Sequence, residues 1–157
     1  MVDALADNSF CRCLNLGVFN SNESGLKGGV MLATNYDFIQ EVGGWLSKFP
    51  WSHYGTFTFR FDRGAESARR IVKGFITSLD QNAKFAMVAE GHKYRASAHI
   101  HALINGLQGL DCFYLVNRWH KRNGIARIYP YDSTKGAAYY IAKNIQYETA
   151  ELDIESM

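Results

Sequence analysis

Cysteine is scarce in this chain of 157 residues, which contains only Cys11, Cys13 and Cys112. An odd number of thiols, with no second pair near Cys11 and Cys13, is typical neither of a disulfide framework nor of a zinc site. We therefore expect free thiols in a reducing compartment.

Long hydrophobic runs and a secretion signal are also missing. No apolar run approaches the roughly 20 residues that cross a bilayer. The first residues, MVDALADNSFCRCL, carry Asp3 early and lack a basic and then apolar pattern. These absences predict a cytoplasmic protein of its host cell without a membrane partner. The length suits one domain with a hydrophobic core.

A strong net charge is absent too, because 17 basic and 15 acidic residues leave a formal charge of +2. So small an excess does not by itself indicate a nucleic-acid partner. The basic residues do gather locally, in RFDR, ARRIVK, HKYR and RWHKRNGIAR, and aromatic residues make up 14% of the chain. Such clusters and aromatic rings suit contacts with phosphates and bases, although solvated faces and cores also contain them.

The periodicity of apolar residues predicts an α+β chain. After a loop-like arm over 1–33, a helix is expected from Thr34, in a capping box with Asp37, to Phe49. Strands are then predicted over 53–61, 84–90, 98–104 and 126–131, with helices over 64–81, 110–122 and 132–147, the last capped by Asp132 or Ser133.

The order of these elements after residue 50 is β-α-β-β-α-β-α. Its first six members follow the ferredoxin-like, split-βαβ pattern of an antiparallel sheet. Such a sheet carries helices on one face and leaves the other face open for a ligand. Alternation along HYGTFTFRF puts three polar side chains on that second face, those of Thr56, Thr58 and Arg60.

Two histidines interrupt the apolar strand AHIHALI at positions 99 and 101. Residues two apart on a strand share a face, so both imidazoles can reach one metal ion. If strands 84–90 and 98–104 form a hairpin, Glu90 falls close to His99. Two histidines and a carboxylate with open coordination positions are typical of a catalytic metal site. A satisfied pair of core or surface histidines is the competing interpretation.

The last predicted helix contains AAYYIAKNIQY. Tyr140 lies three positions before Lys143 and Tyr139 lies four before it, so both tyrosines neighbour the lysine. A tyrosine beside an ammonium group can act as a nucleophile, because its phenolate is stabilised. Geometry alone does not choose between the two tyrosines, and an ordinary amphipathic helix is the alternative.

These motifs together resemble those of the HUH endonucleases, of the type that initiates rolling-circle replication. HIH at 99–101 matches the family's second motif, and YIAK at 140–143 matches its third, Tyr-x-x-Lys. TFTF at 56–59 stands where the first, variable motif lies. Glu90 has the spacing of the family's acidic metal ligand. The resemblance covers roughly residues 51–147 and selects Tyr140 over Tyr139.

The resemblance implies an activity. His99, His101 and Glu90 would bind Mg²⁺ or Mn²⁺. Tyr140 would attack a phosphate of single-stranded DNA and become linked to its 5′ side, and Lys143 would orient the phosphate or neutralise its charge. The enzyme would thereby nick and rejoin DNA to start the replication of a plasmid or virus.

The resemblance also implies partners, namely single-stranded or origin hairpin DNA and host replication proteins such as a helicase and a polymerase. The DNA is expected near Thr56, Thr58 and Arg60, and near Lys93 and Arg95 of the basic HKYR cluster. The whole chain, 1–157, would be one nuclease domain. Residues 1–50 would form an arm and helix, 51–147 the catalytic core and 148–157 a tail.

Several alternatives stay open. A histidine-triad hydrolase would need a third histidine at position 103, which is Leu103. A non-catalytic single-strand binding module of ferredoxin-like fold would explain the basic clusters but not the histidines. Relaxases carry their tyrosine before the histidines, whereas tyrosine transposases share the order found here. Asn144 replaces the second tyrosine of some family members, which favours a single-tyrosine enzyme.

Overall fold

The computed structural model describes residues 30–91, 97–145 and 153–155. Within them the chain is α+β. The helices are α2 (Val30–Leu46), α3 (Ala65–Leu79), α4 (Cys112–His120), the 3₁₀ turn η1 (Ser133–Lys135) and α5 (Ala137–Ile145). The strands are β1 (His53–Phe57), β2 (Lys84–Gly91), β3 (Ala98–Asn105), β4 (Ala126–Pro130) and β5 (Asp153–Glu155).

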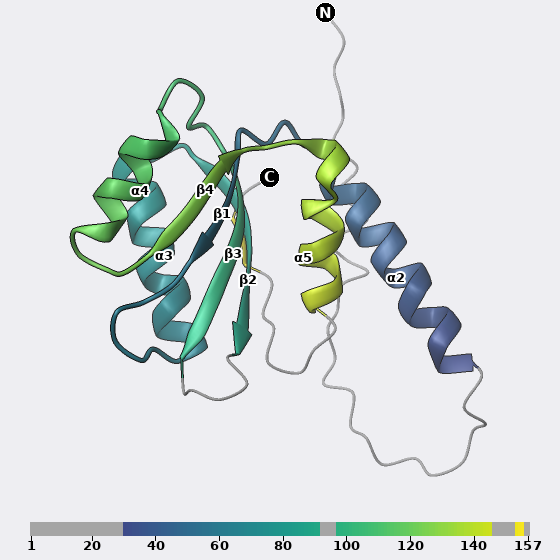
Figure 1. Ribbon diagram of the computed structural model, residues 1–157. Coiled ribbons are helices and arrows are strands. Elements are labelled where there is room, and N and C mark those ends of the chain that lie inside the picture. The colour runs from purple at the N-terminus through teal and green to yellow at the C-terminus, as the bar shows by residue number, and fades with distance from the viewer. Residues whose placement is uncertain (1–29, 92–96, 146–152, 156–157) are drawn as a thin grey trace, which may run out of the picture.

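The strands form one antiparallel sheet in the order β4-β1-β3-β2-β5 (Figure 1). The β2–β3 register pairs Glu90 with His99, as the predicted hairpin requires. The α+β class and the order of elements from β1 to α5 agree with the sequence prediction, and the sheet is consistent with a ferredoxin-like fold. Strand β5 was not predicted; it lies in the segment expected to be a tail.

Helices α3 and α4 cover one face of the sheet (Figure 1). The helical stripe of α3 buries Val72, Phe75 and Ile76 against this face because apolar residues recur there every three or four positions. Trp119 of α4 lies fully buried against Phe57 and Phe75, with ring centroids 4.9 and 5.3 Å away. Edge-to-face aromatic contacts of this kind define the centre of the main core.

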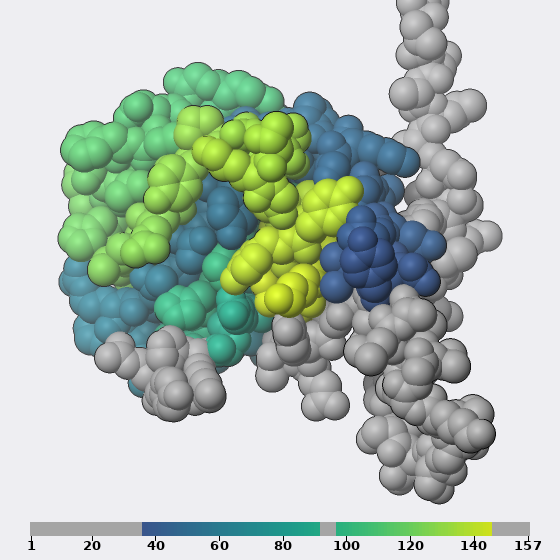
Figure 2. Space-filling model, turned by 45° about the vertical axis from the view of Figure 1, so that its right-hand side comes forward, coloured from purple at the N-terminus to yellow at the C-terminus, as the bar shows by residue number. Residues whose placement is uncertain are grey.

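The opposite face is only partly open, which corrects the prediction of helices on one face. Helix α5 packs on Ala86, Val88 and Leu103, and α2 packs on α5 (Figure 1). Because β2 is apolar on both sides, an uncovered second face would have exposed these side chains to water. Figure 2 shows what stays uncovered, the blue and teal of the sheet between the light green of β4 and the yellow of α5.

Two predicted helix starts were wrong. Helix α2 begins at Val30, so Thr34 lies inside the helix and does not cap it. Asp132 caps only η1, where its carboxylate accepts from the backbone N–H of Thr134. Gly136 then takes a left-handed conformation with φ of 69°, and α5 starts after it. This turn directs α5 onto the sheet, since glycine adopts positive φ without steric cost. Among the described residues, no helix is long and apolar enough to cross a membrane.

Candidate active site

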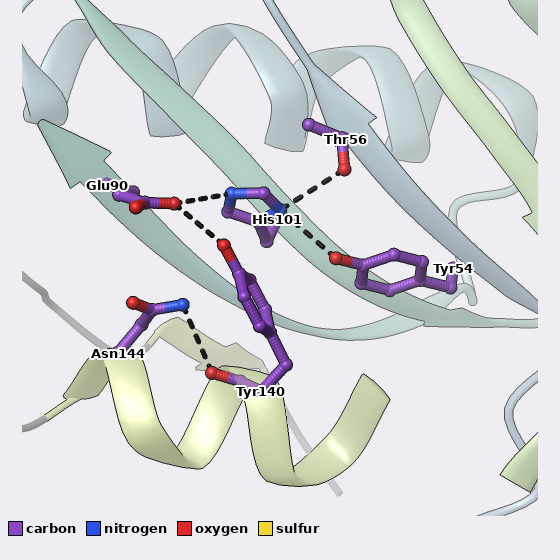
Figure 3. Close-up of polar contacts among 6 residues, drawn as sticks. All are labelled: Tyr54, Thr56, Glu90, His101, Tyr140 and Asn144. Carbon is purple, nitrogen blue, oxygen red and sulfur yellow. Dashed lines mark hydrogen bonds and ion pairs between the residues drawn. The ribbon is translucent and has the colours of Figure 1, made fainter. Parts of the chain in front are cut away.

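Glu90, His101 and Tyr140 meet at one carboxylate oxygen (Figure 3). Oε2 of Glu90 lies 2.9 Å from Nε2 of His101 and accepts a hydrogen bond of 2.9 Å from the hydroxyl of Tyr140. Glu90 is the last residue but one of β2, His101 lies on β3 and Tyr140 lies in the first turn of α5. Three elements therefore place a carboxylate, an imidazole and a phenol in direct contact.

The second ring nitrogen of His101 is also held. Its Nδ1 lies 3.1 Å from the hydroxyl of Tyr54 and 3.1 Å from Oγ1 of Thr56, both on β1 (Figure 3). The β1–β3 register pairs Thr56 with His101, so the two side chains share a face of the sheet. With Nδ1 occupied on one side, Nε2 is directed toward Glu90 and Tyr140. The outer contacts fix the ring orientation, as they do for imidazoles that bind metals.

Burial sets the protonation states in this cluster. It lowers the pKa of the His101 imidazole, against the opposing effect of Glu90, and thereby favours the neutral ring that can bind a metal ion. Burial and the Glu90 carboxylate both raise the pKa of Tyr140, so its hydroxyl is protonated at neutral pH. A nucleophilic Tyr140 would therefore need a group that accepts its proton.

A cavity of about 530 Å³ opens beside these residues on the uncovered part of the sheet. Its lining includes five of the residues singled out in the sequence, namely Thr56, Thr58, Glu90, His99 and His101. Ile125 and Arg127, the register partner of Thr56, also line it. The predicted metal ligands and two of the predicted DNA contacts thus surround one polar space.

The three predicted metal ligands are near one another but do not converge on a point. In the described parts of the chain, no three His, Cys, Asp or Glu side chains are arranged to hold a metal ion. Nε2 of His101 and Oε2 of Glu90, 2.9 Å apart, match the edge of about 3 Å between neighbouring ligands of an octahedral ion. His99 borders the same cavity and is only partly buried, so the donor set fits a divalent cation provided that His99 turns toward it.

The two adjacent tyrosines of α5 are separated by the packing of the helix. Tyr140 contacts Glu90, and its ring centroid lies 4.9 Å from that of His101. Tyr139 packs on α2 instead, where a Cβ added to Gly43 would come within 2.4 Å of its ring. The structure therefore brings only Tyr140 to the histidine cluster, a choice that helical spacing left open.

Lys143 is exposed on α5, and its side chain makes no hydrogen bond or ion pair with another described residue. Arg60 is not in the cavity, because its guanidinium turns to the backbone oxygen of His120 at 3.5 Å. Strand β1 ends at Phe57, so the alternation expected through Arg60 does not continue. Lys93 and Arg95 lie outside the described residues.

Sequence reasoning missed Tyr54 and Arg127. The register pairs Tyr54 with Leu103 and Arg127 with Thr56, which places both on the face of His101. The signal for Arg127 was the alternation in ARIYP, whose first and third residues are buried and whose second is exposed. Tyr54 could have been found by counting back two positions from Thr56.

No protein-family model, curated protein or solved structure matches this chain.

Proposed function

We propose that this protein is a metal-dependent HUH endonuclease that nicks and rejoins single-stranded DNA to initiate rolling-circle replication. The single observation that carries the proposal is the contact of Tyr140 and His101 with one oxygen of Glu90. The hairpin brings Glu90 and His101 together, but Tyr140 is 50 positions from Glu90 and has no need to reach this carboxylate in an ordinary core. The fold proposed with this function is a ferredoxin-like, split-βαβ domain.

The reaction follows from the protonation states of the chain's own groups. The Tyr140 hydroxyl gives its proton to Oε2 of Glu90, its hydrogen-bond acceptor, while its oxygen attacks the phosphorus. The new bond joins the tyrosine oxygen to the 5′ phosphate, and the bond from phosphorus to the 3′ oxygen breaks. The departing 3′ oxygen takes up the proton that Glu90 accepted and becomes a free 3′-hydroxyl, and the Glu90 carboxylate is ionised again. Attack by that hydroxyl, or by another, reverses the step and rejoins DNA.

His101, Glu90 and His99 are the side chains that would hold Mg²⁺ or Mn²⁺. Such an ion would act as a Lewis acid that withdraws charge from the scissile phosphate. Tyr54 and Thr56 would keep the ring of His101 directed toward the site through its Nδ1. Lys143 is exposed near Tyr140 on α5 and would approach the phosphate only when DNA is bound.

Single-stranded DNA would lie in the cavity between β4 and α5. Arg127 offers a guanidinium there that can bind a phosphate in two places. Thr56 and Thr58 line the path, with their hydroxyl groups on Nδ1 of His101 and on the backbone oxygen of Ile125. The side chain of Ile125 is 64% exposed at the rim and offers an apolar surface to a base. This path replaces the one through Arg60 that the sequence suggested.

A non-catalytic single-strand binding protein is the second candidate, favoured by the incomplete convergence of the three metal ligands. A tyrosine transposase or a relaxase would use the same site and the same chemistry in a different biological process. Tyr140 follows the histidines in the chain, the order that initiators and tyrosine transposases share and relaxases lack.

Formation of a covalent DNA adduct tests the proposal. The protein is incubated with Mn²⁺ and single-stranded oligonucleotides of varied sequence, and labelled protein–DNA species are separated on a denaturing gel. Wild type and Tyr139→Phe are expected to form the adduct, whereas Tyr140→Phe is expected to bind DNA without cutting it. Cutting that survives in Tyr140→Phe would overturn the assignment of the nucleophile, and a wild type that forms no adduct with any oligonucleotide would overturn the enzyme itself.

A further inference from the structure

A second basic cavity lies on the other side of the molecule, between α3 and α4. It has a volume of about 680 Å³, and its lining includes Arg118, Lys121 and Arg122 but no acidic side chain. Both helices cover the face of the sheet opposite to α5 (Figure 1), so this groove is separate from the cavity that contains His101. The proposed nicking reaction gives it no role.

The cations of this α3–α4 groove are not engaged elsewhere in the described parts of the chain. Arg118 donates to the hydroxyl of Tyr114 over 2.8 Å, which orients its guanidinium without neutralising it. Lys121 and Arg122 form no ion pair with a described carboxylate. Three uncompensated cations that converge on one concave surface favour a polyanionic ligand.

A simpler role is possible for basic residues at this place, because cations at the C-terminal end of a helix stabilise its dipole. The end of α4 already has partners for its carbonyl groups, however. The backbone N–H groups of Lys121, Arg122 and Asn123 bond to Asn117 and Trp119. Arg60 donates to the oxygen of His120. The side-chain charges of Lys121 and Arg122 are therefore not needed as caps.

The connection from α4 to β4 joins the groove to the candidate active site. Lys121, Arg122 and Asn123 line the groove, and Ile125 and Arg127, only a few residues further, line the catalytic cavity. A DNA strand that leaves the cavity that contains His101 (the catalytic cavity) past Arg127 meets the groove after it passes this short loop. This continuity points to the same polyanion in both places.

We infer that the α3–α4 groove binds the sugar–phosphate backbone of DNA that flanks the segment in the catalytic cavity. The half-exposed ring of Tyr114 adds a surface on which a base can stack. DNA as the ligand rests on the proposed function, whereas the anion-binding groove does not. Its contribution would be independent of sequence, because contacts to phosphates carry no base information.

Gly74 of α3 gives a way to block the groove without damage to the fold. It lines the groove, and a Cβ added there would meet nothing within 4 Å. Glycine is a poor helix former, so its replacement in the middle of α3 does not weaken the helix. Gly74→Glu puts a carboxylate among the three cations, and Gly74→Gln adds a neutral side chain of the same size as the matched control.

Binding of fluorescent single-stranded oligonucleotides is measured by anisotropy in the presence of a chelator, so that nothing is cut. A short oligonucleotide that fills only the catalytic cavity is compared with one about three times longer. We expect wild type and Gly74→Gln to bind the longer oligonucleotide more tightly than the short one. Gly74→Glu is expected to lose roughly tenfold in affinity for the longer oligonucleotide and none for the short one. The double variant Lys121→Gln/Arg122→Gln should lower the salt dependence of log K on the longer DNA by about 1.4.

Thermal unfolding of each variant checks that the groove variants are folded. Equal affinities of Gly74→Glu and Gly74→Gln for the longer DNA would overturn the inference, as would an equal loss on short and long DNA. Tighter, groove-dependent binding of a polyglutamate peptide than of DNA would also overturn it, in favour of an acidic protein partner. A protein that never nicks DNA but shows the Gly74→Glu loss supports the groove and rejects the nuclease.

Discussion

The hydroxyl of Tyr140 donates to Oε2 of Glu90 over 2.9 Å, although the two residues are 50 positions apart in the sequence. The bond connects α5 to the end of β2 and depends on how α5 lies over the sheet. Ala138, Ile141 and Ala142 set that position, because they are buried on the face of α5 that contacts Val88 and Leu103. The packing of small apolar residues therefore decides which tyrosine reaches the site.

Glu90→Gln should separate the effect of the negative charge of Glu90 from the effect of its hydrogen bonds. The amide keeps the shape and can still contact Tyr140 and His101, but it is a much weaker ligand for a divalent ion. We expect the affinity for Mn²⁺, measured by calorimetry, to fall by more than tenfold while the unfolding temperature changes little. Glu66→Gln, a change of the same charge in the first turn of α3, is the control. Unchanged Mn²⁺ binding in Glu90→Gln would remove this residue from the ligand set.

Tyr54 and Thr56 should act as positioning residues for His101. Either hydroxyl can hold Nδ1 when the other is removed, so Tyr54→Phe and Thr56→Val are each expected to have a small effect. The double variant frees the ring to rotate and should weaken Mn²⁺ binding by about 10- to 100-fold. Additive effects of the two single variants, measured in a double-mutant cycle, would contradict the shared role.

Gly43→Ala should displace α2 from α5. The new methyl group would lie 2.4 Å from Cδ1 of Tyr139, so either the ring or the helix has to move. We expect a loss of about 1–3 kcal/mol in the free energy of unfolding, measured in urea. Tyr139→Ala should recover part of the loss in the double variant. Gly44→Ala, whose Cβ would find its nearest neighbour at 3.9 Å, should be neutral or stabilising.

The stability of the protein should fall in mild acid. Burial lowers the pKa of both His53 and His101 below the ordinary value of 6.5. The unfolded chain then binds more protons than the folded protein between the lowered pKa and 6.5, so stability is complete above 6.5 and is lost as the pH falls. Urea unfolding from pH 7.5 to 5 measures this dependence.

His53→Gln removes one of the two groups and should reduce the slope of stability against pH. Ile104→Val alters the register partner of His53 and adds or removes no titrating group, so it should shift stability at every pH alike. A slope that is the same in His53→Gln as in wild type would assign the acid sensitivity to other residues.

The hairpin that carries Glu90 and His99 was predictable because strand alternation has a fixed period of two. The sequence could not tell that Glu90 bonds to His101, which is not its register partner, since the reach and rotamer of a glutamate depend on what else occupies the face. Tyr140 donates to the same carboxylate oxygen that His101 contacts. That contact depends on a helix that follows much later in the chain.

The partial cover of the second sheet face could have been inferred from β2. The run KFAMVAE is apolar without interruption from Phe85 to Ala89, a pattern of strands that are buried on both sides. Ala86 and Val88 are in fact fully buried under α5. The break at Gly136 was harder to foresee. Asp132 is a good capping residue and the helical pattern follows it directly, so the sequence predicted one helix across Gly136.

Strand β5 also has a consequence for the border of the sheet. It pairs Asp153 with Met87 and Glu155 with Phe85, so three residues supply the hydrogen bonds along the free side of β2. A chain that ended before Asp153 would leave the backbone of β2 unpaired, and another molecule could add a strand there. Self-association of such a shortened protein would begin at the strand that carries Glu90, so aggregation and loss of the proposed metal ligand would occur together.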